Sequence, residues 1–322
     1  MKNFLTKKNL LNLVWITGIF ALFFVLIQFR ILSPYQKTVL YWMGIYVILG
    51  VSLNIIIGIT GQLSLGHAGF MSIGAYAAAI VLAMKPDLTG LFIGMLVGLG
   101  ITLLVSFVVA MPTLRLKGDY LAIATLGVGE IIRIIILNMT ITNGASGISN
   151  IKMLMNWPLL FAFVILAIFT THNFKNSAVG RACIAIKEDE IAAEAMGINT
   201  TKYKVMAFMF GAALASIAGS LYATTYYVVK PETFGVNTSI NILIIVVFGG
   251  MGSLSGSVIA TIFIGIINMF LQPYAEMRLI MYALVLIIVM IFRPQGLLGS
   301  KEFLLNNFKL KAFSFKRKEV KP

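Results

Sequence analysis

The feature that most constrains this chain is a series of apolar runs long enough, or nearly so, to cross a lipid bilayer. Ten runs follow one another, at residues 11–29, 39–59, 68–84, 91–111, 120–137, 157–171, 205–223, 240–248, 257–271 and 279–292. A helix needs about 20 residues to cross about 30 Å of hydrocarbon, so residues 240–248 cannot cross without their flanks. Because backbone polar groups must be paired inside a bilayer, the sequence predicts an all-α polytopic integral membrane protein. We expect about eight to ten transmembrane helices, some of them short or broken.

Composition supports this class and sets the domain boundaries. Hydrophobic residues make up 59% of the 322 residues, charged residues only 11%, and mean hydropathy is +0.96, which excludes a soluble globular domain. The first run ends at Phe29 and Arg30 without a small-x-small cleavage site, so we interpret it as a retained anchor. Residues 1–299 are therefore predicted to form a transmembrane domain. Residues 300–322 form a basic tail, expected to lie on the anionic inner leaflet.

The distribution of basic residues predicts the orientation of the chain. With ten crossings and an inside start, eighteen Lys and Arg residues fall on the inner side and six on the outer side, and Arg133 lies within the membrane, which accounts for all 25. This asymmetry follows the positive-inside rule. We expect a multi-pass protein of the cell membrane with both termini in the cytoplasm. The net charge of +14 is a topology signal and gives no indication of nucleic-acid binding.

Residues 172–204 form a polar loop that itself has the pattern of short helices. Acidic residues lie on one side of its second helix, and a small apolar stripe lies on another, with Gly197 as the stop signal. The stripe consists of Ile191, Ala192, Ala195 and Met196. A helix lying on the bilayer surface is one interpretation. Acidic residues and small alanines suit a helix seated in a groove of another protein better, so we expect a cytoplasmic coupling loop.

Two glycine-rich interruptions, at residues 61–69 and 249–256, divide apolar segments. They resemble corresponding positions of two halves, because Ser64 and Leu65 are echoed by Ser253 and Leu254. Broken helices at related positions indicate a substrate pathway, and the residues that would line it here are Gln62, Ser64, His67 and Ser253. The glycines could equally serve close helix packing or tight turns.

Few polar groups lie inside the apolar runs. Glu130 and Arg133 are three residues apart, share a helix face and can neutralise one another. They could lock neighbouring helices, the reading we favour, or sense the two charges of a zwitterionic substrate. Asn143 lies in the turn-rich outer loop 142–147, which could shape an outer gate or simply connect two helices.

Several function classes are disfavoured by missing motifs. The sequence has no phosphate-binding loop, so the chain should not be its own nucleotide-driven motor. His67 and His172 have no Cys, Asp or Glu partner at ligand spacing, and no catalytic constellation is present, so we expect no metal, no cofactor and no enzyme activity. Glu130 is the one carboxylate at membrane depth, which disfavours ion-coupled transport.

Five motifs in order along the chain resemble those of the LivM-type permeases of branched-chain amino acid ABC transporters. They are residues 61–70, 117–127 with 130–133, 180–182 with 186–193 and 195–198, 249–256, and 293–299. The resemblance implies a pore shared with a homologous LivH-type permease, two cytoplasmic ATPase subunits and an extracytoplasmic substrate-binding protein.

By this resemblance, the loop 172–204 would couple the permease to an ATPase through Glu190, Ala192, Ala193 and Gly197. The substrate pathway would comprise the residues of the two interruptions together with Glu130, Arg133 and Asn143. The implied function is ATP-driven import of branched-chain, aliphatic amino acids. The same permease type also serves urea and short amides, which remain an alternative, as does an ion-coupled secondary transporter.

Overall fold

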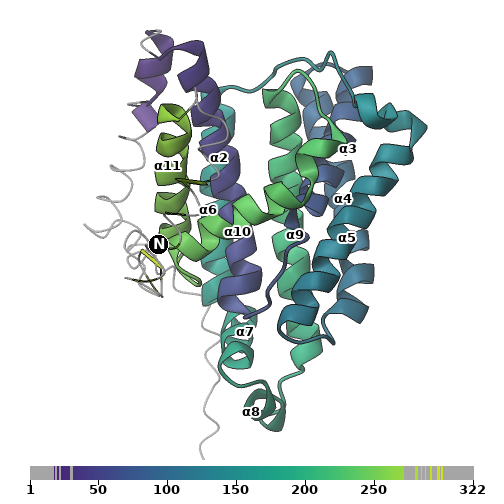
Figure 1. Cartoon of the computed structure of the whole chain (residues 1–322), viewed down its shortest axis with the longest axis vertical. Helices are drawn as coiled ribbons and strands as arrows, with labels where there is room; N and C mark the ends of the chain where they lie inside the picture. The colour runs from purple at the N-terminus through teal and green to yellow at the C-terminus, as the bar shows by residue number, and fades with distance from the viewer. Residues whose placement is uncertain are drawn as a thin grey trace, which may run out of the picture.

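The computed structural model of this chain describes residues 32–271 without interruption and further positions within 18–29 and 280–299. Helices account for the regular structure of this part, and one isolated antiparallel bridge joins Ile148 to Val229. The long helices stand side by side, with α10 crossing obliquely among them and the short helices α7 and α8 at one end (Figure 1). The structure therefore confirms the all-α polytopic fold.

Six helices in the described part are long and apolar enough to cross a membrane. They are α2 (Pro34–Asn54) with the π-helical turn η1 (Ile55–Ile59), α3 (His67–Met84), α4 (Leu88–Thr113), α5 (Asp119–Asn138), α6 (Trp157–Asn176) and α9 (Thr200–Thr225). The predicted runs 39–59 through 205–223 are thus each found in one of these helices. The runs 11–29 and 279–292 lie largely outside the described residues.

The remaining described helices are short. α10 (Val236–Gly249) contains the run 240–248, and its 14 residues span about 21 Å, less than the hydrocarbon layer. It is bent by 119° from α11 (Leu254–Phe270). On the opposite end from α7, the 3₁₀ turns η2 (Thr140–Thr142), η3 (Gly144–Ser146) and η4 (Pro231–Phe234) form the connections.

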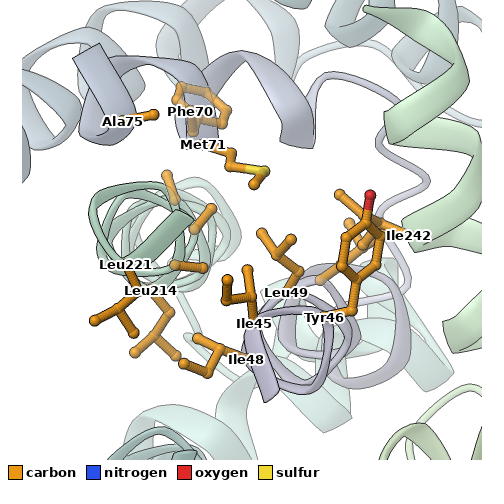
Figure 2. Packing of buried hydrophobic residues seen from close by; sticks show 14 of the residues in the cluster. Ile45, Tyr46, Ile48, Leu49, Phe70, Met71, Ala75, Leu214, Leu221 and Ile242 are labelled. Carbon is orange, nitrogen blue, oxygen red and sulfur yellow. The ribbon is translucent and has the colours of Figure 1, made fainter. Parts of the chain in front are cut away.

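The core lies where α9 packs against α2, α3 and α4, with α3 and α4 also in contact with each other. Small residues let the backbones approach: a Cβ at Gly74 would come within 1.9 Å of the Ser216 carbonyl, and one at Gly219 within 1.9 Å of the Met71 carbonyl. Ser220 Oγ donates to the Gly74 carbonyl at 3.1 Å. Close van der Waals packing and interhelical hydrogen bonds are what hold helices together in lipid. Larger side chains of α2, α3, α9 and α10 fill the space between these contacts (Figure 2).

The polar loop is helical, as predicted, but its limits differ. α6 continues to Asn176 and α9 begins at Thr200, so residues 177–199 remain for α7 (Ala178–Glu188) and α8 (Glu190–Ala195). The second helix was expected to include residues 187–189. Asp189 instead ends α7 and begins α8, because its extended backbone and its side-chain bonds to the Ile191 and Ala192 N–H groups make it an N-cap.

Candidate functional site

The first interruption breaks the chain between α2 and α3. After η1, residues 61–66 run without helical structure, and α3 begins at His67. The side chains of Gln62 and Ser64 are buried, and their polar atoms have no hydrogen-bond partner among the described residues. His67 Nε2 lies 2.7 Å from Ser52 Oγ, whereas its Nδ1 has no partner in this part of the chain. Unpaired polar atoms at a helix break are the chemistry expected of a path for a polar solute.

α5 and α10 hold this first break in place. The Leu65 N–H donates to Thr125 Oγ1 on α5 at 3.0 Å, and the Ala68 N–H donates to Ser239 Oγ on α10 at 3.2 Å. A Cβ at Gly66 would fall within 2.1 Å of the Thr125 carbonyl. The glycine-rich motif therefore also permits close helix packing, so the two interpretations of it are compatible.

The second break separates α10 from α11. Ser253 caps α11: its Oγ accepts from the Gly256 N–H at 3.0 Å. Ser64 was expected to correspond to Ser253, but it does not cap a helix. Ser64 precedes α3 by three residues, and Gly66 is the N-cap of α3. A matching Ser-Leu pair therefore occupies different positions in the two breaks.

Asn54, at the end of α2, joins the two breaks. Its Nδ2 donates to the Ser253 carbonyl and to Ser257 Oγ, both at 2.8 Å, and its Oδ1 accepts from the Gly252 N–H at 2.7 Å. Asn54 is fully buried. The end of α2, which leads into the first break, is thus bonded directly to the second break.

Glu130 and Arg133 form the expected pair on α5. Arg133 Nε lies 2.7 Å from Glu130 Oε2, and each side chain is about one quarter exposed. Gly235, just before α10, faces them, since a Cβ there would lie 3.8 Å from Glu130 Oε1. The pair neutralises itself, which agrees with a structural role.

Asn143 lies apart from these residues. It is exposed, has left-handed backbone (φ 61°) and donates from Nδ2 to the Gly147 carbonyl of its own loop at 3.1 Å. Its observed contact is that of a connecting turn.

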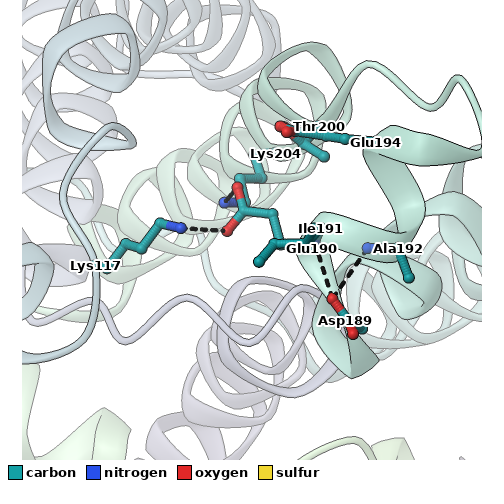
Figure 3. Close-up of polar contacts among 8 residues, drawn as sticks. All are labelled: Lys117, Asp189, Glu190, Ile191, Ala192, Glu194, Thr200 and Lys204. Atoms are coloured by element: carbon teal, nitrogen blue, oxygen red, sulfur yellow. Dashed lines mark hydrogen bonds and ion pairs between the residues drawn. The ribbon is translucent and has the colours of Figure 1, made fainter.

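At the end of the molecule opposite Asn143, α8 is clamped to the bundle through Glu190. This carboxylate lies 2.5 Å from Lys204 Nζ on α9 and 3.5 Å from Lys117 Nζ, between α4 and α5 (Figure 3). Partial burial alone would raise the pKa of Glu190, but the hydrogen bond and charge of Lys204 and the charge of Lys117 outweigh it and lower the pKa. Glu190 therefore stays ionised and holds the helix.

The exposed surface of α8 differs from the predicted contact set. Ala193 is buried within the chain, so it is not available to a partner in this conformation. Ala192 and Ala195 are exposed, and Ile191 and Met196 are 78% and 83% exposed. Gly197 ends the helix as predicted: with φ 82° it donates to the Glu194 carbonyl, and Ile198 donates to that of Ala193, the two bonds of a Schellman motif.

Residues 36–293 match the family model described as the permease component of branched-chain amino acid transport systems. The chain belongs to this permease family. It is 36% identical over 293 residues to the high-affinity branched-chain amino acid transport permease protein LivM of Salmonella typhimurium, covering 79% of this chain and 68% of the relative. The LivM protein of Escherichia coli K12 is 34% identical with the same coverage. The LivH protein of that strain is 34% identical over 149 residues, 45% of this chain and 47% of the relative. No solved structure matches.

Three residues that contact the two breaks or the turn leading into them are absent from the predicted site: Asn54, which bonds Gly252 and Ser253, Lys175, which bonds the Gly252 carbonyl, and Lys187, which bonds the Gly58 carbonyl. Asn54 carried a signal, since it is an amide inside an otherwise apolar run. The two lysines carried none, because basic residues at the inner ends of helices are expected for topology alone.

Proposed function

We propose that this chain is a membrane-spanning subunit of an ATP-driven importer of branched-chain amino acids, which an extracytoplasmic binding protein delivers. It would pair with a LivH-type permease and two cytoplasmic ATPases, and would itself catalyse no covalent step. Support for the substrate class comes from the relatives, whose names state branched-chain amino acid transport. The half-length similarity to LivH supports a homologous partner.

The observation that carries the mechanism is the juxtaposition of an exposed helical loop with two helix breaks at one end of the bundle. Ile191 and Met196 present apolar side chains outward on α8, where an ATPase could hold them. The partner-free amide of Gln62 lies in the adjoining first break. An ATPase that moved the loop would therefore act close to a polar discontinuity in the membrane domain.

The charges of the described part support a cell-membrane protein with this end in the cytoplasm. The α7–α8 end carries Arg115, Lys117, Lys175, Arg181, Lys187, Lys202 and Lys204. The opposite end carries Lys37, Lys85, Lys152 and Lys230. The excess of basic residues at the α7–α8 end agrees with the positive-inside rule if this end faces the cytoplasm, and with a topology in which both termini lie inside.

Reconstitution in proteoliposomes tests the function. The chain, a LivH-type subunit, the ATPases and the binding protein should import radiolabelled leucine, isoleucine and valine when ATP is on the cytoplasmic side. Urea and acetamide serve as competing substrates, and a protonophore together with a sodium ionophore removes proton and sodium gradients. Import of urea but not leucine would replace the substrate class. Import that needs a gradient and no ATP would make the protein a secondary transporter.

A further inference from the structure

Two lysines from the loop end of the protein bind backbone carbonyls at the two helix breaks, one in the π-helical turn η1 that leads into the first break and one within the second break. Lys187, in the last turn of α7, donates from Nζ to the Gly58 carbonyl at 2.9 Å. Lys175, in the last turn of α6, donates from Nζ to the Gly252 carbonyl at 2.7 Å. The Lys187 stem passes over Gly61, where a Cβ would lie 3.1 Å from Lys187 Cγ. Each helix that leads into or through the loop therefore contacts a different break.

These contacts suit the chemistry of a broken helix. Carbonyls at helix ends lack intrahelical partners and carry partial negative charge, so they attract a cation. A hydrogen bond with an ionised donor is also stronger than a neutral one. Because a lysine joins through one atom at the tip of a long side chain, such a bond can form and break without unfolding either helix.

The two breaks themselves form one unit. A Cβ at Gly58 would lie 2.4 Å from the Gly252 N atom, so the two backbones are in direct contact. Asn54 bonds to Gly252 and Ser253 across the same contact. Gly296 packs against Gly250 as well, and the Leu297 N–H donates to the Phe248 carbonyl at 2.9 Å. A force applied at Gly58 or at Gly252 is therefore delivered to both breaks.

We propose that the joined breaks close the cytoplasmic end of the transport path and that Lys187 and Lys175 are positioning residues that transmit movement of the loop 177–199 to them. The proposal rests on the proposed function in one respect, namely that an ATPase moves this loop. Movement of the loop would pull on the Gly58 and Gly252 carbonyls through the two lysine bonds and so shift the breaks. The loop is then coupled to the gate, although no single residue contacts both the ATPase and the substrate.

A cysteine reporter in the second break tests the gate. Met251 is 49% exposed and is replaced by Cys in the complete transporter in lipid nanodiscs. The native Cys183 is buried and burial raises its pKa to about 11, so it should stay unlabelled near neutral pH. The rate of labelling by a fluorescent maleimide is measured without nucleotide and with ATP trapped by vanadate. The two rates should differ severalfold in the parent.

The lysine variants are compared in this background. Lys187→Met, alone and with Lys175→Met, should abolish the nucleotide-dependent change in labelling and lower the leucine imported per ATP hydrolysed about tenfold, within the usual range of coupling between sites. Lys187→Arg, which keeps a charged donor, should retain most of both. Lys202→Met, which alters an exposed lysine at the start of α9, is the matched control. The amount of ATPase that co-purifies with the permease should be the same for all of these variants. Lys187→Gln replaces Lys187→Met if that protein does not assemble.

The gate and the lysine link are contradicted by different results. An equal nucleotide effect on labelling in the parent and Lys187→Met proteins overturns the lysine link. No nucleotide effect in the parent overturns the gate. The labelling assay does not depend on which substrate is transported. If the transporter with unchanged lysines imports no leucine, the proposed substrate class is refuted, and the labelling comparison still decides the proposal about the lysines.

Discussion

At the scale of single residues, two buried amides in this protein have opposite surroundings. Asn54 uses its side chain in three hydrogen bonds between elements, whereas the Gln62 amide has no partner among the described residues. An unpaired buried polar group costs about 1–3 kcal/mol, so the two residues should respond differently to replacement. We therefore expect Asn54 to stabilise the contact between α2 and the second break, and the Gln62 side chain remains our proposed contact for a passing solute.

Replacing Asn54 by Leu should destabilise the protein by about 2–4 kcal/mol, because the Gly252 N–H, the Ser253 carbonyl and Ser257 Oγ each lose a bond. The measurement is the melting temperature of the purified protein in detergent. Asn138→Leu is the matched control, since Asn138 is exposed and bonds only its own helix in the described structure. Equal, small shifts for both variants would contradict the joining role of Asn54.

Glu130 and Arg133 should behave as a mutually dependent pair. Glu130→Gln and Arg133→Gln each leave a partly buried charge unpaired and should lower the yield of folded protein and its melting temperature. The double variant should recover part of the loss, with a coupling of about 0.5–3 kcal/mol. Losses that simply add would refute structural pairing. A double variant that assembles and hydrolyses ATP but does not transport would instead indicate substrate contact.

At the scale of elements, α8 is notable for being only six residues long. A helix of this length is unstable alone in water, so its position depends on its ends and on contacts with neighbours. Asp189 begins it, Gly197 ends it, Glu190 is bound by Lys204, and Glu194 accepts from Thr200 Oγ1 at 2.7 Å. The chain thus fixes a short helix from both ends and leaves its outer apolar residues exposed.

Those exposed residues are the expected docking surface. Met196→Glu and Ile191→Glu should reduce ATPase co-purification at least about tenfold, because a charge would be buried against the partner. Met153→Glu, at a 62% exposed methionine in the outer loop, is the control for adding a charge. The binding assay is repeated after confirming equal membrane insertion. Full ATPase recovery with both α8 variants would remove this surface from the interface.

The helices and the breaks between them show how much of the fold could be predicted from the sequence. Long apolar runs and glycine-rich motifs predicted the membrane helices and both breaks, because these patterns act locally. The division at Asp189 was missed, since a carboxylate in an acidic helical stretch looks like another surface residue until its side chain is seen to cap. The partners of Asn54 were also unpredictable: Gly252 is 198 residues away, and nothing local in the sequence couples them. The burial of Ala193 could not be predicted either, because it depends on how Glu190 and Glu194 hold α8 against α9.

At the scale of the whole molecule, the charge asymmetry predicts which end faces outward. Ser146→Cys, at an exposed position of the loop 139–156, should react with an impermeant maleimide in intact cells. Lys202→Cys, at the exposed start of α9, should react only after the cells are permeabilised. Cys183 provides a silent background, because it is buried and its pKa is raised to about 11, so little thiolate forms at pH 7. The opposite labelling pattern would invert the proposed topology.

The bond between Asn54 and Gly252 also has a consequence for biosynthesis. At about 5–20 residues per second, a ribosome that has just made Asn54 needs about 10–40 s to add the 198 residues that separate it from Gly252. Throughout that interval the Asn54 side chain lacks the three hydrogen-bond partners that it has in the folded protein. We therefore expect a fragment that stops before residue 252 to leave the Asn54 side chain without these partners, and to be degraded faster than the full chain.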